Sequence, residues 1–183
     1  YENKLFMGNG GAIPMKWDGT YLTRHGVYPP VSSPTYSTIT GSAGTAVANY
    51  YFKVSYVNSA SVEGNVSSNS VAASLTSQSA ILDLPVAAQS FGVAARRIYA
   101  ASGSVSGTYS RVTEIADNTT ATYSFTAGQA LGVAAPTDNG VPPLWNAAVV
   151  HQNRIFVNDT ANPNYVWYSG IGEPYTFGAT DFV

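Results

Sequence analysis

The stretch 50-YYFKVSYV-57 decides the fold class. Successive side chains of a β-strand point to opposite faces of a sheet. The alternation in this stretch therefore predicts a strand that turns one face toward a core. We expect that face to carry Tyr50, Phe52, Val54 and Tyr56, and the other face to carry Tyr51, Lys53 and Ser55.

Further strand-like runs follow at short intervals. They are 70-SVAASLT-76, 80-AILDLP-85, 95-ARRIYAA-101, 108-TYSRVTEIA-116 and 121-ATYSFTA-127. Clusters of Asn, Ser and Gly separate these runs. Short strands at such intervals, with turn residues between them, are typical of a β-sandwich. The segment 85–94 contains alanines, but Gly92 makes anything beyond a turn unfavourable. We predict a β-sandwich over residues 35–137.

Two proline-rich stretches bound this region, 28-YPPVSSP-34 and 134-AAPTDNGVPP-143, and we interpret them as linkers. In residues 1–34, Asp18–Gly19 lies between two extended runs, which is a hairpin signal. In residues 138–183, two strands are expected to meet near residues 151–153, and 165-YVWYSG-170 is a further strand. The two flanks resemble each other, so the sandwich is expected to be an insertion in a second β domain.

The composition agrees with an all-β protein and excludes several classes. Tyr occurs 13 times among 183 residues, and β-branched and small polar residues are abundant. Without cysteine there is no disulfide, thiolate nucleophile or cysteine zinc site. Eight basic and ten acidic residues, for a net charge of −2, do not indicate nucleic-acid recognition. No apolar run approaches the roughly 20 residues of a membrane span.

No constellation in the sequence predicts catalysis. The two histidines, His25 and His151, both lie beside expected turns. No nucleophile elbow, H-E-x-x-H motif or calcium loop is present, and most carboxylates fall at turns, where they are ordinary. We therefore expect no catalytic residue, no metal and no cofactor.

The remaining polar candidates are arginines. Alternation puts Arg96 and Arg97 on opposite faces, so one of them must lie over the packed side or near its edge. We interpret Arg97 and Arg154 as structural braces. Arg154 is expected to join a strand to a loop, and a carboxylate such as Asp159 or Glu173 could pair with it.

Exposed aromatic residues are the candidates for an interface. Most of the aromatic side chains are expected in the core or in cross-strand pairs. Trp17, Trp167 and Tyr51 are the candidate interface aromatics.

Parts of the sandwich region resemble known modules. The stretch 50-YYFKVSYVNSASVEGNVSSNS-70 is similar to a run of fibronectin-III and immunoglobulin-like modules, as is 96-RRIYAASGSVSGTYSRVTEIADNTTATYSFT-126. Ala100 and Phe125 stand where those modules have an arginine and an aspartate. The resemblance implies an immunoglobulin/fibronectin-III-like sandwich.

The flanks resemble virion proteins of tailed bacteriophages. The stretches are 5-LFMGNGGAIPMKWDGTYLTRHGVYPP-30 and 149-VVHQNRIFVNDTANPNYVWYSGIGEPYTF-177. They are similar to strand pairs of propeller-like head-completion and tail-nozzle proteins. The resemblance implies a partial propeller-like domain, ring assembly, and contacts with copies of itself and neighbouring virion proteins. It supplies no catalytic residues.

The expected function is that of a structural virion protein at a phage tail or head-to-tail junction. A carbohydrate- or receptor-binding module that uses exposed aromatics is the main alternative, and a fragment of a tail-associated glycosidase is a third. Residue 1 is Tyr, and the chain ends inside a strand-like run. We therefore expect it to be a segment of a longer polypeptide.

Overall fold

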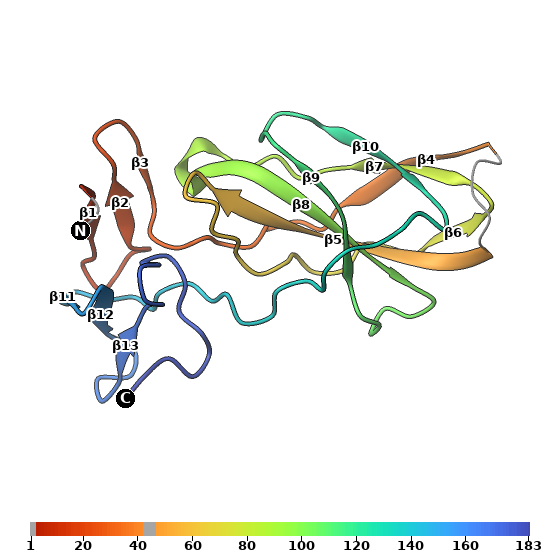
Figure 1. The fold of residues 1–183 in the computed structure, drawn as a ribbon. Helices are drawn as coiled ribbons and strands as arrows, with labels where there is room; N and C mark the ends of the chain where they lie inside the picture. The colour runs from red at the N-terminus through yellow and green to blue at the C-terminus, as the bar shows by residue number, and fades with distance from the viewer. Residues whose placement is uncertain (1–2, 42–46) are drawn as a thin grey trace.

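The computed structural model describes residues 3–41 and 47–183 (Figure 1). These residues form several antiparallel β-sheets, and no α-helix occurs among them. The strands are β1 (Leu5–Met7), β2 (Met15–Trp17), β3 (Leu22–Arg24), β4 (Thr35–Thr40), β5 (Val47–Asn58), β6 (Ala73–Thr76), β7 (Ser79–Asp83), β8 (Val93–Ser102), β9 (Ser110–Ile115), β10 (Thr122–Thr126), β11 (Ala148–His151), β12 (Arg154–Asn158) and β13 (Val166–Tyr168). The all-β prediction is confirmed.

The central part of the chain is sandwich-like. A sheet of order β10-β7-β4 and a sheet of order β6-β5-β8-β9 share one hydrophobic core, and Figure 1 shows them stacked. Phe52 and Ile98 of one sheet and Leu82 and Phe125 of the other are fully buried in it. Burying a side chain of this size stabilises a fold by roughly 1.5–3 kcal/mol, so these contacts hold the two sheets together.

The alternation expected for residues 50–57 is confirmed. Tyr50, Phe52, Val54 and Tyr56 are all buried. The other face of β5 is covered as well, because Tyr51 packs against Tyr99 and Tyr109, and Ser55 is fully buried. The strand is therefore covered on both faces.

The segment between β7 and β8 contains only one short helical turn. The 3-10 helix η1 (Gln89–Phe91) ends at Gly92, whose φ of 66° lies in the left-handed region. A side chain is strained in that conformation, so glycine ends the turn and lets the chain enter β8. The expectation of no more than a turn over 85–94 is confirmed.

The two flanks fold into small sheets of order β1-β2-β3 and β11-β12-β13, which lie beside one end of the sandwich (Figure 1). The predicted hairpins at Asp18–Gly19 and near residues 151–153 are confirmed. The backbone NH of Gly10 donates to the carbonyl of Trp145 at 2.9 Å, and Phe6 and Trp167 pack on one core around Trp145. The first and last parts of the chain thus pack together.

A small cluster joins the flanks to the sandwich. Val27 and Tyr175 from the flanks pack with Tyr56 of β5, and Phe91 and Val93 border them. No strand of the described residues crosses the expected boundaries at 34/35 and 137/138. The division into domains 1–34, 35–137 and 138–183 stays a prediction.

Candidate functional site

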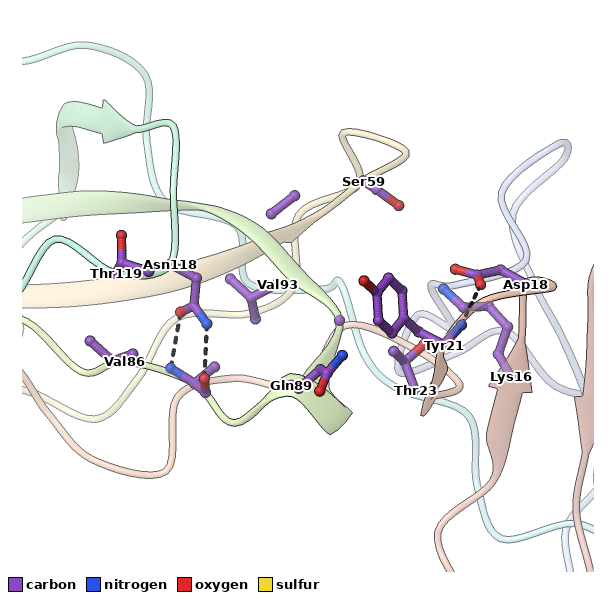
Figure 2. Close-up of a pocket in the computed structure, with 13 residues that line it drawn as sticks. Lys16, Asp18, Tyr21, Thr23, Ser59, Val86, Gln89, Val93, Asn118 and Thr119 are labelled. Carbon is purple, nitrogen blue, oxygen red and sulfur yellow. Dashed lines mark hydrogen bonds between the residues drawn. The ribbon is translucent and has the colours of Figure 1, made fainter.

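A cleft of about 510 Å³ lies where the β2–β3 hairpin faces the end of the sandwich (Figure 2). One side comes from residues 16–23 and the other from residues 59, 86–94 and 118–119. It is lined by Lys16, Asp18, Tyr21, Thr23, Ser59, Val86, Ala87, Gln89, Gly92, Val93, Ala94, Asn118 and Thr119. A volume of roughly 300–1,000 Å³ is usual for a small-molecule site.

The hairpin side of the cleft is built by an Asp turn. The Oδ1 atom of Asp18 accepts hydrogen bonds from the backbone NH groups of Thr20 at 3.0 Å and Tyr21 at 2.9 Å. These bonds lower the pKa of Asp18, with a further contribution from Lys16. Tyr21 projects from this turn toward the opposite side of the cleft (Figure 2), and its side chain is half exposed.

The sandwich side is held by paired hydrogen bonds. The amide of Asn118 accepts from the NH of Ala87 at 3.0 Å and donates to its carbonyl at 2.8 Å, as the dashed lines of Figure 2 show. Val86 and Val93 present apolar surface beside this pair. The two loops that form this wall are therefore fixed to each other.

A buried arginine lies behind the same wall. The guanidinium of Arg96, whose side chain is fully buried, donates to the carbonyls of Asp117 at 3.1 Å, Pro85 at 3.2 Å and Thr120 at 2.6 Å. It also pairs with the Asp117 carboxylate at 3.3 Å. Burial lowers the pKa of Arg96, and Asp117 opposes that effect. Alternation predicted that one of Arg96 and Arg97 would lie over the packed side or near its edge, and in the structure that residue is Arg96.

The inner face of the small sheet forms the bottom of the cleft. Lys16 and Thr23, paired across β2 and β3, are 6% and 5% exposed. The Lys16 ammonium lies over the ring of Tyr175, 4.8 Å from its centroid. The Thr23 hydroxyl has no hydrogen-bond partner among the described residues. Gly92 packs against it, since a Cβ at Gly92 would lie 3.1 Å from the Cβ of Thr23.

The outer face of the same sheet is apolar and exposed. Leu5, Trp17 and Leu22 are cross-strand neighbours in one row across β1, β2 and β3. Their exposed fractions are 56%, 40% and 49%. Because side chains alternate along a strand, this row faces away from Lys16 and Thr23. Trp17, a predicted interface aromatic, thus lies in an exposed apolar row.

The other two predicted interface aromatics are half-buried against their own chain. Trp167 packs on the core around Trp145, and its indole NH donates to Asp159 at 3.2 Å. Tyr51 packs against Tyr99. The surface that each can offer a partner is correspondingly smaller than that of Trp17, and an interface role for either stays a prediction.

Arg97 lies on the face of β8 opposite Arg96. It forms ion pairs with Glu63 at 2.6 Å and Glu114 at 2.7 Å. Glu63 also accepts hydrogen bonds from the hydroxyls of Tyr99 and Ser55. Burial and the Glu63 carboxylate raise the pKa of Tyr99. Arg97 thus links β8, β9 and the segment that follows β5.

Arg154 contacts the end of β13. Its Nη1 donates to the carbonyl of Ser169 at 3.0 Å, and its guanidinium lies 5.1 Å from the centroid of the Tyr168 ring. The expected carboxylates make other contacts: Asp159 accepts from Trp167, and Glu173 from Thr176. In the described residues the partner of Arg154 is a carbonyl rather than a carboxylate.

The two histidines differ in environment. His25 is fully buried, and its Nε2 lies 2.6 Å from the carbonyl oxygen of Pro174, to which it donates. Burial lowers the pKa of His25 to about 4, and Lys16 contributes to the shift. His151 is exposed at the end of β11. The His25 ring packs against aromatic rings of both flanks, a role that the sequence does not predict.

Among the described residues, no group of three or more His, Asp or Glu side chains is placed to hold a metal ion. No helix of the described part is long and apolar enough to span a membrane. The sequence matches no protein-family model and, at a significant level, no curated protein.

Proposed function

We propose that the chain is a structural protein of a phage virion, at the tail or the head-to-tail junction. It acts by packing against copies of itself and against neighbouring virion proteins. The observation that carries this proposal is the exposed row Leu5–Trp17–Leu22 on the outer face of the small N-terminal sheet. Contiguous exposed apolar surface of this kind is typical of protein interfaces.

The edge of the C-terminal sheet supports the same proposal. Strand β11 is an edge strand, and all four of its residues are exposed, with Val149 at 61% and Val150 at 51%. An apolar edge strand leaves backbone NH and carbonyl groups free to pair with a strand of another chain. In an assembly, the exposed apolar row and the edge strand β11 would both be contact surfaces.

We also infer that the central sandwich is immunoglobulin/fibronectin-III-like and that the flanks form part of a propeller-like domain. Among the described residues, the sandwich has seven strands in a three-stranded and a four-stranded antiparallel sheet, a number and division that agree with an immunoglobulin/fibronectin-III-like sandwich. The two three-stranded flanking sheets, drawn from opposite ends of the chain, are compatible with a partial propeller-like domain that the sandwich interrupts.

The test is self-association of the purified chain over a range of concentrations, by mass photometry and sedimentation velocity. Trp17→Glu puts a charge into the apolar row and should weaken association about thirtyfold, which corresponds to about 2 kcal/mol. Val71→Glu is the matched control, because Val71 is 73% exposed and lies outside the row. Negative-stain images should contain closed rings. A chain that stays monomeric at every concentration contradicts the proposal.

A further inference from the structure

We propose that the cleft between the β2–β3 hairpin and the end of the sandwich binds a neutral hydroxylated ring, such as one sugar residue of a glycan. The site is independent of the assembly surface, because the cleft and the row Leu5–Trp17–Leu22 lie on opposite faces of the same sheet.

The surface of the cleft matches the two sides of a sugar ring. Val86, Val93 and Ala94 give it apolar lining, and the half-exposed Tyr21 ring stands across from Val86 and Val93 (Figure 2). A sugar ring has a face of C–H groups that packs on an aromatic side chain. Its hydroxyls point outward from that face and need polar partners.

Polar groups are available around the same space. Gln89 and Ser59 are exposed at the rim, and the Tyr21 phenol points into the cleft. The Thr23 hydroxyl is buried at the bottom with no partner among the described residues. That hydroxyl lies beneath Gly92 and has almost no accessible surface, so Gln89, Ser59 and Tyr21 supply the polar groups that a ligand can reach.

The charges of the cleft favour a neutral ligand. Lys16 and Asp18 are its two charged lining residues, they carry opposite charges, and their attraction contributes to the lowered pKa of Asp18. The two charges cancel, so the described lining carries no net charge that would attract an ion. The opposed pair therefore disfavours an ionic ligand of either sign.

The cleft is also held in shape before any ligand arrives. Arg96 ties the loops that contain Pro85 and Thr120, Asn118 clamps Ala87, and Asp18 fixes the turn that carries Tyr21. A preformed site does not have to order its own loops on binding, which favours affinity for a small ligand.

The experiment is a titration of the ¹⁵N-labelled chain with glucose, galactose, mannose and N-acetylglucosamine, followed by amide chemical shifts. At least one sugar should give saturable shifts at residues 18–23, 86–94 and 118–119. Tyr21→Ala should weaken binding about tenfold. Ala94→Trp should abolish it, because the exposed Ala94 side chain lines the cleft and a larger one fills it.

Two controls make the result decisive. Trp17→Ala removes an exposed aromatic from the outer face of the same sheet and should leave sugar affinity unchanged. N-acetyl-leucinamide tests whether the cleft takes an apolar peptide side chain instead. The proposal is overturned if no sugar gives saturable shifts, if the shifts survive Ala94→Trp, or if only the leucine probe binds.

Discussion

The guanidinium of Arg96 donates to the carbonyl of Thr120 at 2.6 Å although its side chain is fully buried. Two further carbonyls, of Pro85 and Asp117, accept from the same group. A buried cation is tolerated only when its donors are satisfied. Here they are satisfied by the two loops that form one wall of the cleft, so Arg96 positions that wall.

Replacing Arg96 should cost much more stability than replacing its neighbour. Arg96→Met leaves three carbonyls without their donor and should lower the free energy of unfolding by about 3 kcal/mol. Arg97→Met removes ion pairs that are partly exposed and should cost about 1 kcal/mol. Urea denaturation of both variants measures the difference. Equal losses would show that Arg96 does not brace the two loops.

Removing the Thr23 hydroxyl should stabilise the protein. Thr23→Val keeps the shape of the side chain and eliminates a buried hydroxyl that lacks a partner, so the free energy of unfolding should rise by about 1 kcal/mol. Thr20→Val, at an exposed position of the same hairpin, should change it little. A destabilised Thr23→Val variant would mean that this hydroxyl makes a favourable hydrogen bond.

The free energy of unfolding should decrease as the pH is lowered, because of the titration of His25. The pKa of His25 is about 4 in the folded chain, below the ordinary value of 6.5. Between these two pH values the unfolded chain therefore binds a proton at His25 that the folded chain does not bind. The contribution of His25 is thus complete above pH 6.5 and is lost as the pH falls toward about 4, amounting to about 3 kcal/mol.

The variant His25→Gln isolates this effect from the carboxylates that titrate in the same range. A glutamine amide can donate to the Pro174 carbonyl but does not titrate. Unfolding curves of both proteins should be measured across that pH range. The free energy of unfolding should depend less on pH in His25→Gln than in the unmodified protein. The same slope in both proteins would assign the acid sensitivity to other groups.

The contact between the N-terminal flank and the sandwich depends on Gly64. A Cβ at this position would lie 2.1 Å from the carbonyl oxygen of Val27, a backbone atom that cannot easily move. Gly64→Ala should lower the free energy of unfolding by about 2 kcal/mol or more. Gly11→Ala, where the nearest atom is 4.0 Å away, is the control. If Gly64→Ala leaves the free energy of unfolding unchanged, the contact between the flank and the sandwich does not contribute to stability.

Most of the strands can be predicted from local sequence patterns. The burial of Phe52 and Val54 followed from alternation, and the hairpin at Asp18–Gly19 followed from turn chemistry. Strand β4 is not predicted from the sequence, because TYSTIT lacks clear alternation, and the structure has a register shift between Tyr36 and Thr38. A bulge breaks the period on which such predictions rest.

The cleft could not be predicted, because it depends on tertiary packing. Tyr21 and Asn118 are nearly 100 residues apart, and no periodicity relates them. The same holds for His25 and Pro174, and for the carbonyl that Arg154 contacts in place of a carboxylate. Alternation indicated that one of the paired arginines would lie on the packed side, yet only the fold identifies it as Arg96.

The most direct test of the assembly proposal is the protection of the outer face of the small sheet. The chain has no cysteine, so Leu22→Cys and Val71→Cys each carry a single thiol. In concentrated, assembled protein, Leu22→Cys should react with a maleimide several times more slowly than in dilute monomer, and Val71→Cys should react equally in both. Equal reactivity of Leu22→Cys in the two states would contradict the proposal that this face is the interface.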